Sequence, residues 1–87
     1  MVTKAAAAVL EEVRRCSTGQ IVIAGHARER MGERGVTFGD VRHALTNATS
    51  CRAQPNGRWR VTGPDLDGDE LVLVVVLEAG MVVVTVF

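Results

Sequence analysis

The pattern of apolar and polar residues divides the chain into a helical first half and a strand-rich second half. An apolar stripe at helical spacing marks the first helix and consists of Ala6, Val9, Leu10 and Val13. Thr3 can cap this helix, which we expect to run through about Arg15. Gly19 ends the region, and the β-branched segment Gln20–Ala24 predicts a short strand.

Two more helices are predicted before residue 50. The first runs from His26 to about Arg34, and Gly35 is well placed as its C-terminal cap because glycine adopts the left-handed conformation easily. The second opens at Thr37-Phe-Gly-Asp40, a pattern that resembles a capping box, and ends near Asn47.

The second half of the chain is typical of a β-meander. The expected strands are Ser50–Gln54, Arg58–Gly63, Glu70–Glu78 and Met81–Phe87. Asn56-Gly57 is a strong hairpin signal between the first two strands. Pro64–Asp69 and Ala79-Gly80 are the turns between the later ones.

Side chains alternate between faces along the second strand of this meander. Arg58 and Arg60 fall on one face, whereas Trp59 and Val61 fall on the other. We expect Trp59 to anchor the core and the two arginines to project from the more open face.

The last two strands do not alternate. Leu71–Leu77 and Met81–Val84 are apolar throughout, which is typical of strands that are covered on both faces. The helices can cover only one face unless the N-terminal helix wraps to the other side. A homodimer or a protein partner is the other means of covering this surface.

Helices followed by an antiparallel sheet predict an α+β fold with helices packed on one sheet face. We expect a single domain over residues 1–87. Within it, residues 1–19 form an N-terminal helical extension and residues 20–87 form the core.

Composition agrees with a globular protein, because 47% of the residues are hydrophobic and 23% are charged. The longest apolar run, Leu71–Leu77, has seven residues, far fewer than the roughly 18 that a membrane span needs. Ala5–Leu10 is too short for the core of a signal peptide, so we expect a cytoplasmic protein. Cys16 and Cys51 lack metal-site spacing and are expected to be free thiols.

Charge is segregated along the chain although the formal net charge is zero. Residues 26–60 contain seven arginines against three acidic residues, whereas residues 61–87 contain five acidic residues and no base. Such a molecule can present a basic patch to a polyanion. Charged faces also segregate in proteins that bind no anion, so polarity alone decides nothing.

The helix expected at His26–Arg34 carries the strongest candidate chemistry. On a helix, His26, Arg30 and Arg34 share one face, with Ala27 and Met31 on the adjacent buried seam. Arginines grip phosphate oxygens, a histidine titrates near neutral pH, and a helix N-terminus favours an anion. This arrangement favours phosphodiester binding with proton transfer. An ordinary salt-bridged surface helix, with His26 as a capping residue, is the alternative.

Other candidate sites are weaker. Asp65–Glu70 resembles the start of a calcium loop, but the twelfth position is Val76, so an acidic turn is the better interpretation. His43 is expected to be structural or exposed. The chain has no phosphate-binding loop, dinucleotide fingerprint or carboxylate cluster, so neither a metal nor a cofactor is expected.

Four passages of the sequence resemble a small bacterial family of uncharacterised domains. They read HARERMGERGV, TFGDVRHAL, NGRWRVTGPDLDGDELVLVVV and MVVVTVF, and the resemblance spans Ile21 to Phe87. These domains are identified with the RelE-like superfamily of toxin–antitoxin ribonucleases. The resemblance implies a curved antiparallel sheet with two helices on one face, to which this chain adds an N-terminal helix.

The resemblance also implies a function, that of the toxin of a type II toxin–antitoxin system. Such a toxin is a metal-independent mRNA endoribonuclease, acts in some cases on the ribosome, and is neutralised by a cognate antitoxin. In similar toxins, including the MqsR-like ones, the antitoxin is commonly a zinc-finger, helix-turn-helix protein.

Carried over to this chain, the resemblance implies a set of site residues. The family's signature residues match His26, Arg28, Arg30, Arg34, Arg58 and Arg60. We assign His26 to proton transfer and Arg30, Arg58 and Arg60 to the phosphate. Arg28, Arg34 and Arg42 are the expected RNA-binding residues, although packing or ion-pair roles are as consistent with Arg28 and Arg34.

Two other functions remain open from the sequence. The chain could be a non-catalytic RelE-fold module that binds a protein partner or itself. It could also be an unrelated enzyme that acts on a small anionic substrate at the same basic helix.

Overall fold

The order of elements along the chain agrees with the sequence pattern. The computed structural model describes residues 4–16, 19, 21–78 and 81–86. The elements are α1 (Lys4–Cys16), β1 (Ile21–Ile23), α2 (Gly25–Arg34), α3 (Phe38–Thr46), β2 (Ser50–Ala53), the 3₁₀ turn η1 (Pro55–Gly57), β3 (Trp59–Pro64), β4 (Glu70–Glu78) and β5 (Met81–Val86). None of the helices in the described ranges is long and apolar enough to cross a membrane.

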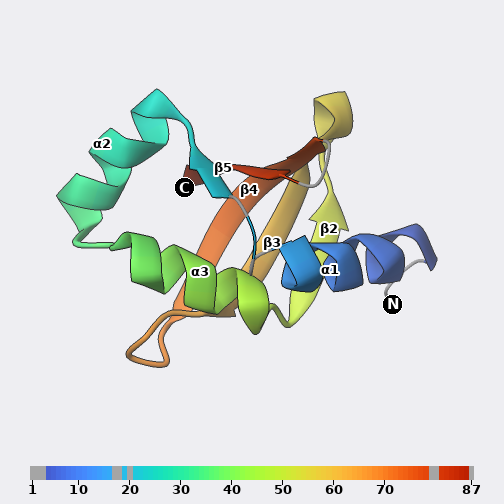
Figure 1. Ribbon diagram of the computed structural model, residues 1–87, viewed down its shortest axis with the longest axis horizontal. Helices are drawn as coiled ribbons and strands as arrows, with labels where there is room; N and C mark the ends of the chain where they lie inside the picture. The colour runs from blue at the N-terminus through green and yellow to red at the C-terminus, as the bar shows by residue number, and fades with distance from the viewer. Residues whose placement is uncertain (1–3, 17–18, 20, 79–80, 87) are drawn as a thin grey trace.

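All five strands form one sheet in the order β1-β5-β4-β3-β2 (Figure 1). The meander β2-β3-β4-β5 is antiparallel, as expected. The expectation of a wholly antiparallel sheet was wrong at β1, which pairs parallel to β5 with Ile21 opposite Val82. The chain leaves β1 through two helices and enters the sheet again at β2, which is the opposite edge. The meander then crosses the sheet from β2 to β5, and β5 lies beside β1 and parallel to it.

The helices pack on one face of this sheet, which we call the core face. Figure 1 shows α1, α2 and α3 on the same side of the strands. α1 packs on β2, α2 on β5 and α3 on β3. The core face of the described strands is built from Ile21, Ile23, Cys51, Val61, Leu71, Leu73 and Val75, with Trp59 packed against it. The predicted α+β class is confirmed, and α1 joins this face rather than wrapping to the other side.

The opposite face of the sheet, which we call the open face, has no helix on it in the described part of the chain. It carries Val72, Val74 and Val76 from β4, and only Val74 is buried. The expectation of helical cover on one face only is therefore confirmed. Cover of the open face by a partner or by a second copy stays a prediction.

Helix ends follow the predicted signals. Gly35 caps α2 in the left-handed region (φ 67°), and the Val36 N–H donates to the Met31 carbonyl at 2.8 Å. The Thr37–Asp40 capping box opens α3, and Asn47 caps its end. The Asn56-Gly57 hairpin is also confirmed, with Gly57 at φ 72° and the Gln54 N–H donating to the Arg58 carbonyl at 2.8 Å. The predicted Thr3 cap and the Ala79-Gly80 turn lie outside the described residues.

A close approach of α3 to β3 sets the depth of the core. A Cβ atom added to Gly63 would lie against the carbonyl group of Ala44, well inside van der Waals distance. Only glycine therefore allows the backbone of α3 to lie directly on β3. This approach is what buries Val41, Ala44 and Leu45 completely.

Gly63→Ala is expected to lower the free energy of unfolding by about 1–3 kcal/mol, because the extra methyl group forces α3 away from β3. Chemical denaturation followed by circular dichroism measures the change. Gly25→Ala is the matched control, since a Cβ at Gly25 meets nothing within 4 Å. Equal stability of the two variants would contradict the packing argument.

Candidate functional site

The open face carries a group of arginines on the β2–β3 hairpin. Arg52 and Arg60 stand directly opposite each other in the register, and Arg58 follows on the same face, opposite Gln54. All three arginines are exposed. Three exposed cationic side chains on one face of two neighbouring strands can contact a polyanion together, so we treat the three residues as one candidate site and call it the hairpin arginines.

The acidic residues lie at the other end of the same strands. Glu70 pairs with Pro64 at the far end of β3, and Asp65, Asp67 and Asp69 belong to the turn between β3 and β4. The segregation of charge in the sequence is therefore also a segregation along the sheet. A polyanion would meet its favourable potential at the hairpin end of the open face.

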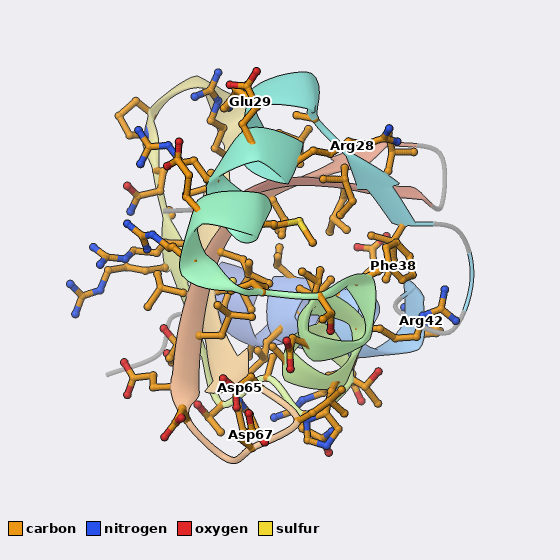
Figure 2. The ribbon with its side chains drawn as sticks, turned by 90° about the vertical axis from the view of Figure 1, so that its left-hand side faces the viewer. Arg28, Glu29, Phe38, Arg42, Asp65 and Asp67 are labelled. Carbon is orange, nitrogen blue, oxygen red and sulfur yellow. The ribbon has the colours of Figure 1, made fainter. Side chains whose placement is uncertain are left out.

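α2 presents a second group of charges. Its N-cap is Ala24, with no side-chain cap, so the interpretation of His26 as a capping residue is wrong. His26, Arg30 and Arg34 are exposed and follow at four-residue spacing, while Ala27 and Met31 are buried as predicted. Figure 2 shows Arg28 and Glu29 leaving α2 on different sides.

The four predicted catalytic residues come from two surfaces. His26 and Arg30 lie on α2, which buries its apolar side on the core face at β5. Arg58 and Arg60 lie at the hairpin end of β3, two strands further along, and face the open side. The structure thus keeps Arg58 together with Arg60, and His26 together with Arg30, on different elements and different faces.

Arg42 and Arg28, two of the predicted RNA-binding residues, lie apart from both groups. The Arg42 guanidinium stands over the Phe38 ring, 5.3 Å from its centroid, and its Nη2 donates to the Gly19 carbonyl at 3.4 Å. Figure 2 shows Arg28, Phe38 and Arg42 along the same side of the molecule.

An open pocket lined mostly by apolar side chains lies on this side, at the outer edge of β1. Its volume is about 540 Å³, within the range of ligand-binding pockets. The cavity, which we call the β1 cavity, is lined by Ile21, Val22, Ile23, Arg28, Met31, Gly32, Val36 and Phe38. No pattern in the sequence predicted this cavity. Phe38, an aromatic residue next to a helix cap and 43% exposed in the structure, was the signal that could have indicated it.

Gly32 is unusual within the wall of this cavity. Glycine inside a helix costs about 0.5–1 kcal/mol relative to alanine, so it normally serves a close packing contact. A Cβ added to Gly32 would meet nothing within 4 Å, and its φ is not in the left-handed region. Neither packing nor backbone conformation explains this glycine, which belongs to the lining of the cavity.

The remaining candidates have structural roles. The Nδ1 of His43 donates to the Pro64 carbonyl at 3.0 Å, in agreement with the expected structural role. Asp65 accepts the N–H groups of Asp67 and Asp69, both at 2.9 Å, in the predicted acidic turn. Cys51 is a buried free thiol whose pKa is raised by burial, so it is a poor nucleophile. The side chain of Cys16 lies outside the described residues. Among the described residues no three metal-ligating side chains come together.

Comparison with known protein families shows which family the chain belongs to. Residues 23–87 match the model of a domain of unknown function, DUF4258. The chain belongs to this family. No curated protein and no solved structure matches the chain. The DUF4258 region includes the hairpin arginines, α2 and most of the β1 cavity, whereas α1 precedes it.

Asp40 fixes the start of α3 in this DUF4258 domain. One carboxylate oxygen accepts the Thr37 N–H at 2.9 Å, and the other accepts the Leu66 N–H at 3.0 Å. These hydrogen bonds, above all the one from Thr37, hold the pKa of the Asp40 carboxyl below its ordinary value of 3.8. The carboxylate therefore ties α3, and with it Phe38, to the β3–β4 turn.

Protonation of Asp40 is expected to destabilise the fold. Because its pKa is lower in the folded chain, its contribution is complete above pH 3.8 and is lost as the pH falls through the lowered value. Asp40→Asn should therefore be less stable at neutral pH and lose less stability than the wild type between about pH 5 and pH 2. Urea denaturation across this range measures the effect. Glu33→Gln, an exposed position on α2, is the control and should keep the wild-type profile.

Proposed function

We propose that this DUF4258 protein binds RNA on the open face of its sheet and acts as the toxin of a type II toxin–antitoxin pair. The observation that carries the proposal is the cross-strand pairing of Arg52 with Arg60, next to Arg58. Three exposed guanidinium groups spread over two neighbouring strands can contact successive phosphates of a single strand. The resemblance to RelE-like toxins supports the choice of RNA.

The reaction proposed is metal-independent cleavage of mRNA. A base takes the proton of a 2′-hydroxyl group, whose oxygen attacks the adjacent phosphorus. The bond from phosphorus to the 5′-oxygen breaks, an acid protonates that oxygen, and the products are a 2′,3′-cyclic phosphate and a 5′-hydroxyl end. In this proposal His26 and Arg30, which share α2, transfer the proton and stabilise the extra negative charge, whereas Arg58 and Arg60 hold the RNA backbone on the open face.

Binding of RNA is expected to depend on the hairpin arginines. The double variant Arg52→Ala/Arg60→Ala should weaken binding of a single-stranded RNA oligonucleotide at every salt concentration. Each lost phosphate contact should also reduce the slope of log K against log salt by about 0.7, so the slope changes by about 1.4. Fluorescence anisotropy with a labelled oligonucleotide measures both quantities.

The control for this experiment is Arg15→Ala, which removes an exposed arginine from α1, on the core side of the sheet. This variant should bind RNA like the wild type. An equal loss of affinity in Arg15→Ala and in the double variant would contradict a specific interface on the open face.

His26 separates catalysis from binding. Induced expression of the wild-type protein is expected to arrest growth, and His26→Ala should relieve the arrest while RNA binding is kept. Loss of a proton-transfer group typically slows a reaction about 100- to 10,000-fold. Growth curves, together with mapping of RNA ends, measure the effect. A harmless wild-type protein would refute the toxin proposal.

A non-catalytic RNA-binding or regulatory module is the second candidate. The observation that favours it is the division of His26 and Arg30 from Arg58 and Arg60 between α2 and the open face. Under this alternative the wild-type protein binds RNA but leaves it intact, and His26→Ala changes neither binding nor growth.

A further inference from the structure

The β1 cavity combines apolar lining side chains with a sheet edge that has no strand neighbour among the described residues. All three residues of β1 line it, and β1 is the edge strand of the sheet, with β5 as its partner on the other side. A strand with a neighbour on one side only directs half of its N–H and C=O groups outward, where another strand can pair with them. The cavity therefore offers backbone hydrogen bonds beside a space for apolar side chains.

Two arginines give this edge its charge. Arg28 belongs to the lining of the cavity, and Arg42 is held over Phe38, whose ring is part of the same wall. Both arginines are exposed, and Figure 2 shows them with Phe38 between them on one side of the molecule. No acidic residue belongs to the lining. A ligand complementary to this edge would carry an apolar group that faces the cavity wall and negative charges on either side of it, opposite Arg28 and Arg42.

From these features we propose that the β1 cavity is the docking site for an extended acidic and apolar peptide segment of a partner protein. The segment adds as a strand to the free edge of β1. An apolar side chain enters the space beside Met31 and Gly32, and carboxylates flanking it pair with Arg28 and Arg42. This proposal does not depend on the RNA-binding function, because it uses a different surface.

The chemistry of the wall favours a peptide over a nucleotide base. Apart from Arg28, the side chains that line the cavity are aliphatic, thioether or phenyl groups, so a base would bury polar edges with few partners. A peptide strand satisfies its own polar groups along β1 and buries only its side chain. The vacant space at Gly32 also fits such a side chain.

Selection from a random peptide library tests the proposal. The wild-type protein is the bait, and peptides that also bind Gly32→Leu are removed, because this leucine fills the cavity from the wall. The enriched peptides are expected to share an apolar residue flanked by acidic residues. A synthetic peptide of the enriched sequence should bind the wild type at least tenfold more tightly than Gly32→Leu or Arg28→Ala.

Two controls separate docking from loss of fold. Gly32→Ala adds one methyl group in open space and should keep both the fold and the peptide affinity. Arg34→Ala removes a charge from the same helix without touching the cavity lining and should bind like the wild type. Thermal unfolding of Gly32→Leu must give a cooperative transition near that of the wild type. Amide hydrogen exchange should show new protection in β1 when the peptide binds.

The proposal fails if no peptide is enriched over Gly32→Leu, or if the enriched peptides lack acidic residues. A wild-type dimer that Gly32→Leu dissociates would assign the cavity to a second copy of the chain and overturn it. Loss of RNA affinity in Gly32→Leu would assign the cavity to RNA, with the same consequence.

Discussion

The contact between the backbones of Gly63 and Ala44 sets the position of everything on the core face. α3 lies on β3 without a side chain between them, so its apolar residues reach into the sheet at full depth. Asp40 then binds the β3–β4 turn through the Leu66 N–H, which fixes the rotation of the helix about that contact. At the other end, Arg14 of α1 donates to the carbonyl of Ala48 at 3.0 Å, which attaches the first helix to the end of the third. These contacts fix the start of α3 and therefore the position of Phe38, which forms one wall of the β1 cavity.

Because the helices all occupy one face, the other face is left to the strands themselves. The central strand supplies valines there, and the hairpin supplies arginines. The apolar and basic parts lie side by side along the open face. The basic side of α2, with His26, Arg30 and Arg34, lies on neither the apolar nor the basic part of the open face. If the proposed function holds, RNA binding on the open face and proton transfer on α2 would take place on separate surfaces.

The sequence predicted local structure well because local signals were strong. The capping box at Thr37, the glycine cap at Gly35 and the Asn56-Gly57 hairpin each bring a specific backbone geometry, and each appears where expected. The alternation around Trp59 also predicted the correct face for Arg60. The direction of β1 could not be predicted, because three residues contain no information about a partner some 60 positions away. Nor could the β1 cavity, which arises only where β1, α2 and the start of α3 meet.

The pairing of β1 with β5 joins segments that lie about 60 residues apart in the sequence, whereas each hairpin of the meander joins neighbouring strands. Closing a loop of this length costs more chain entropy than closing a hairpin, and such pairs generally form after the local ones. The meander with α3 can therefore assemble first, and the edge strand with its cavity is completed last. The edge that we propose as a docking site for a strand is thus also the part of the sheet that is expected to form last.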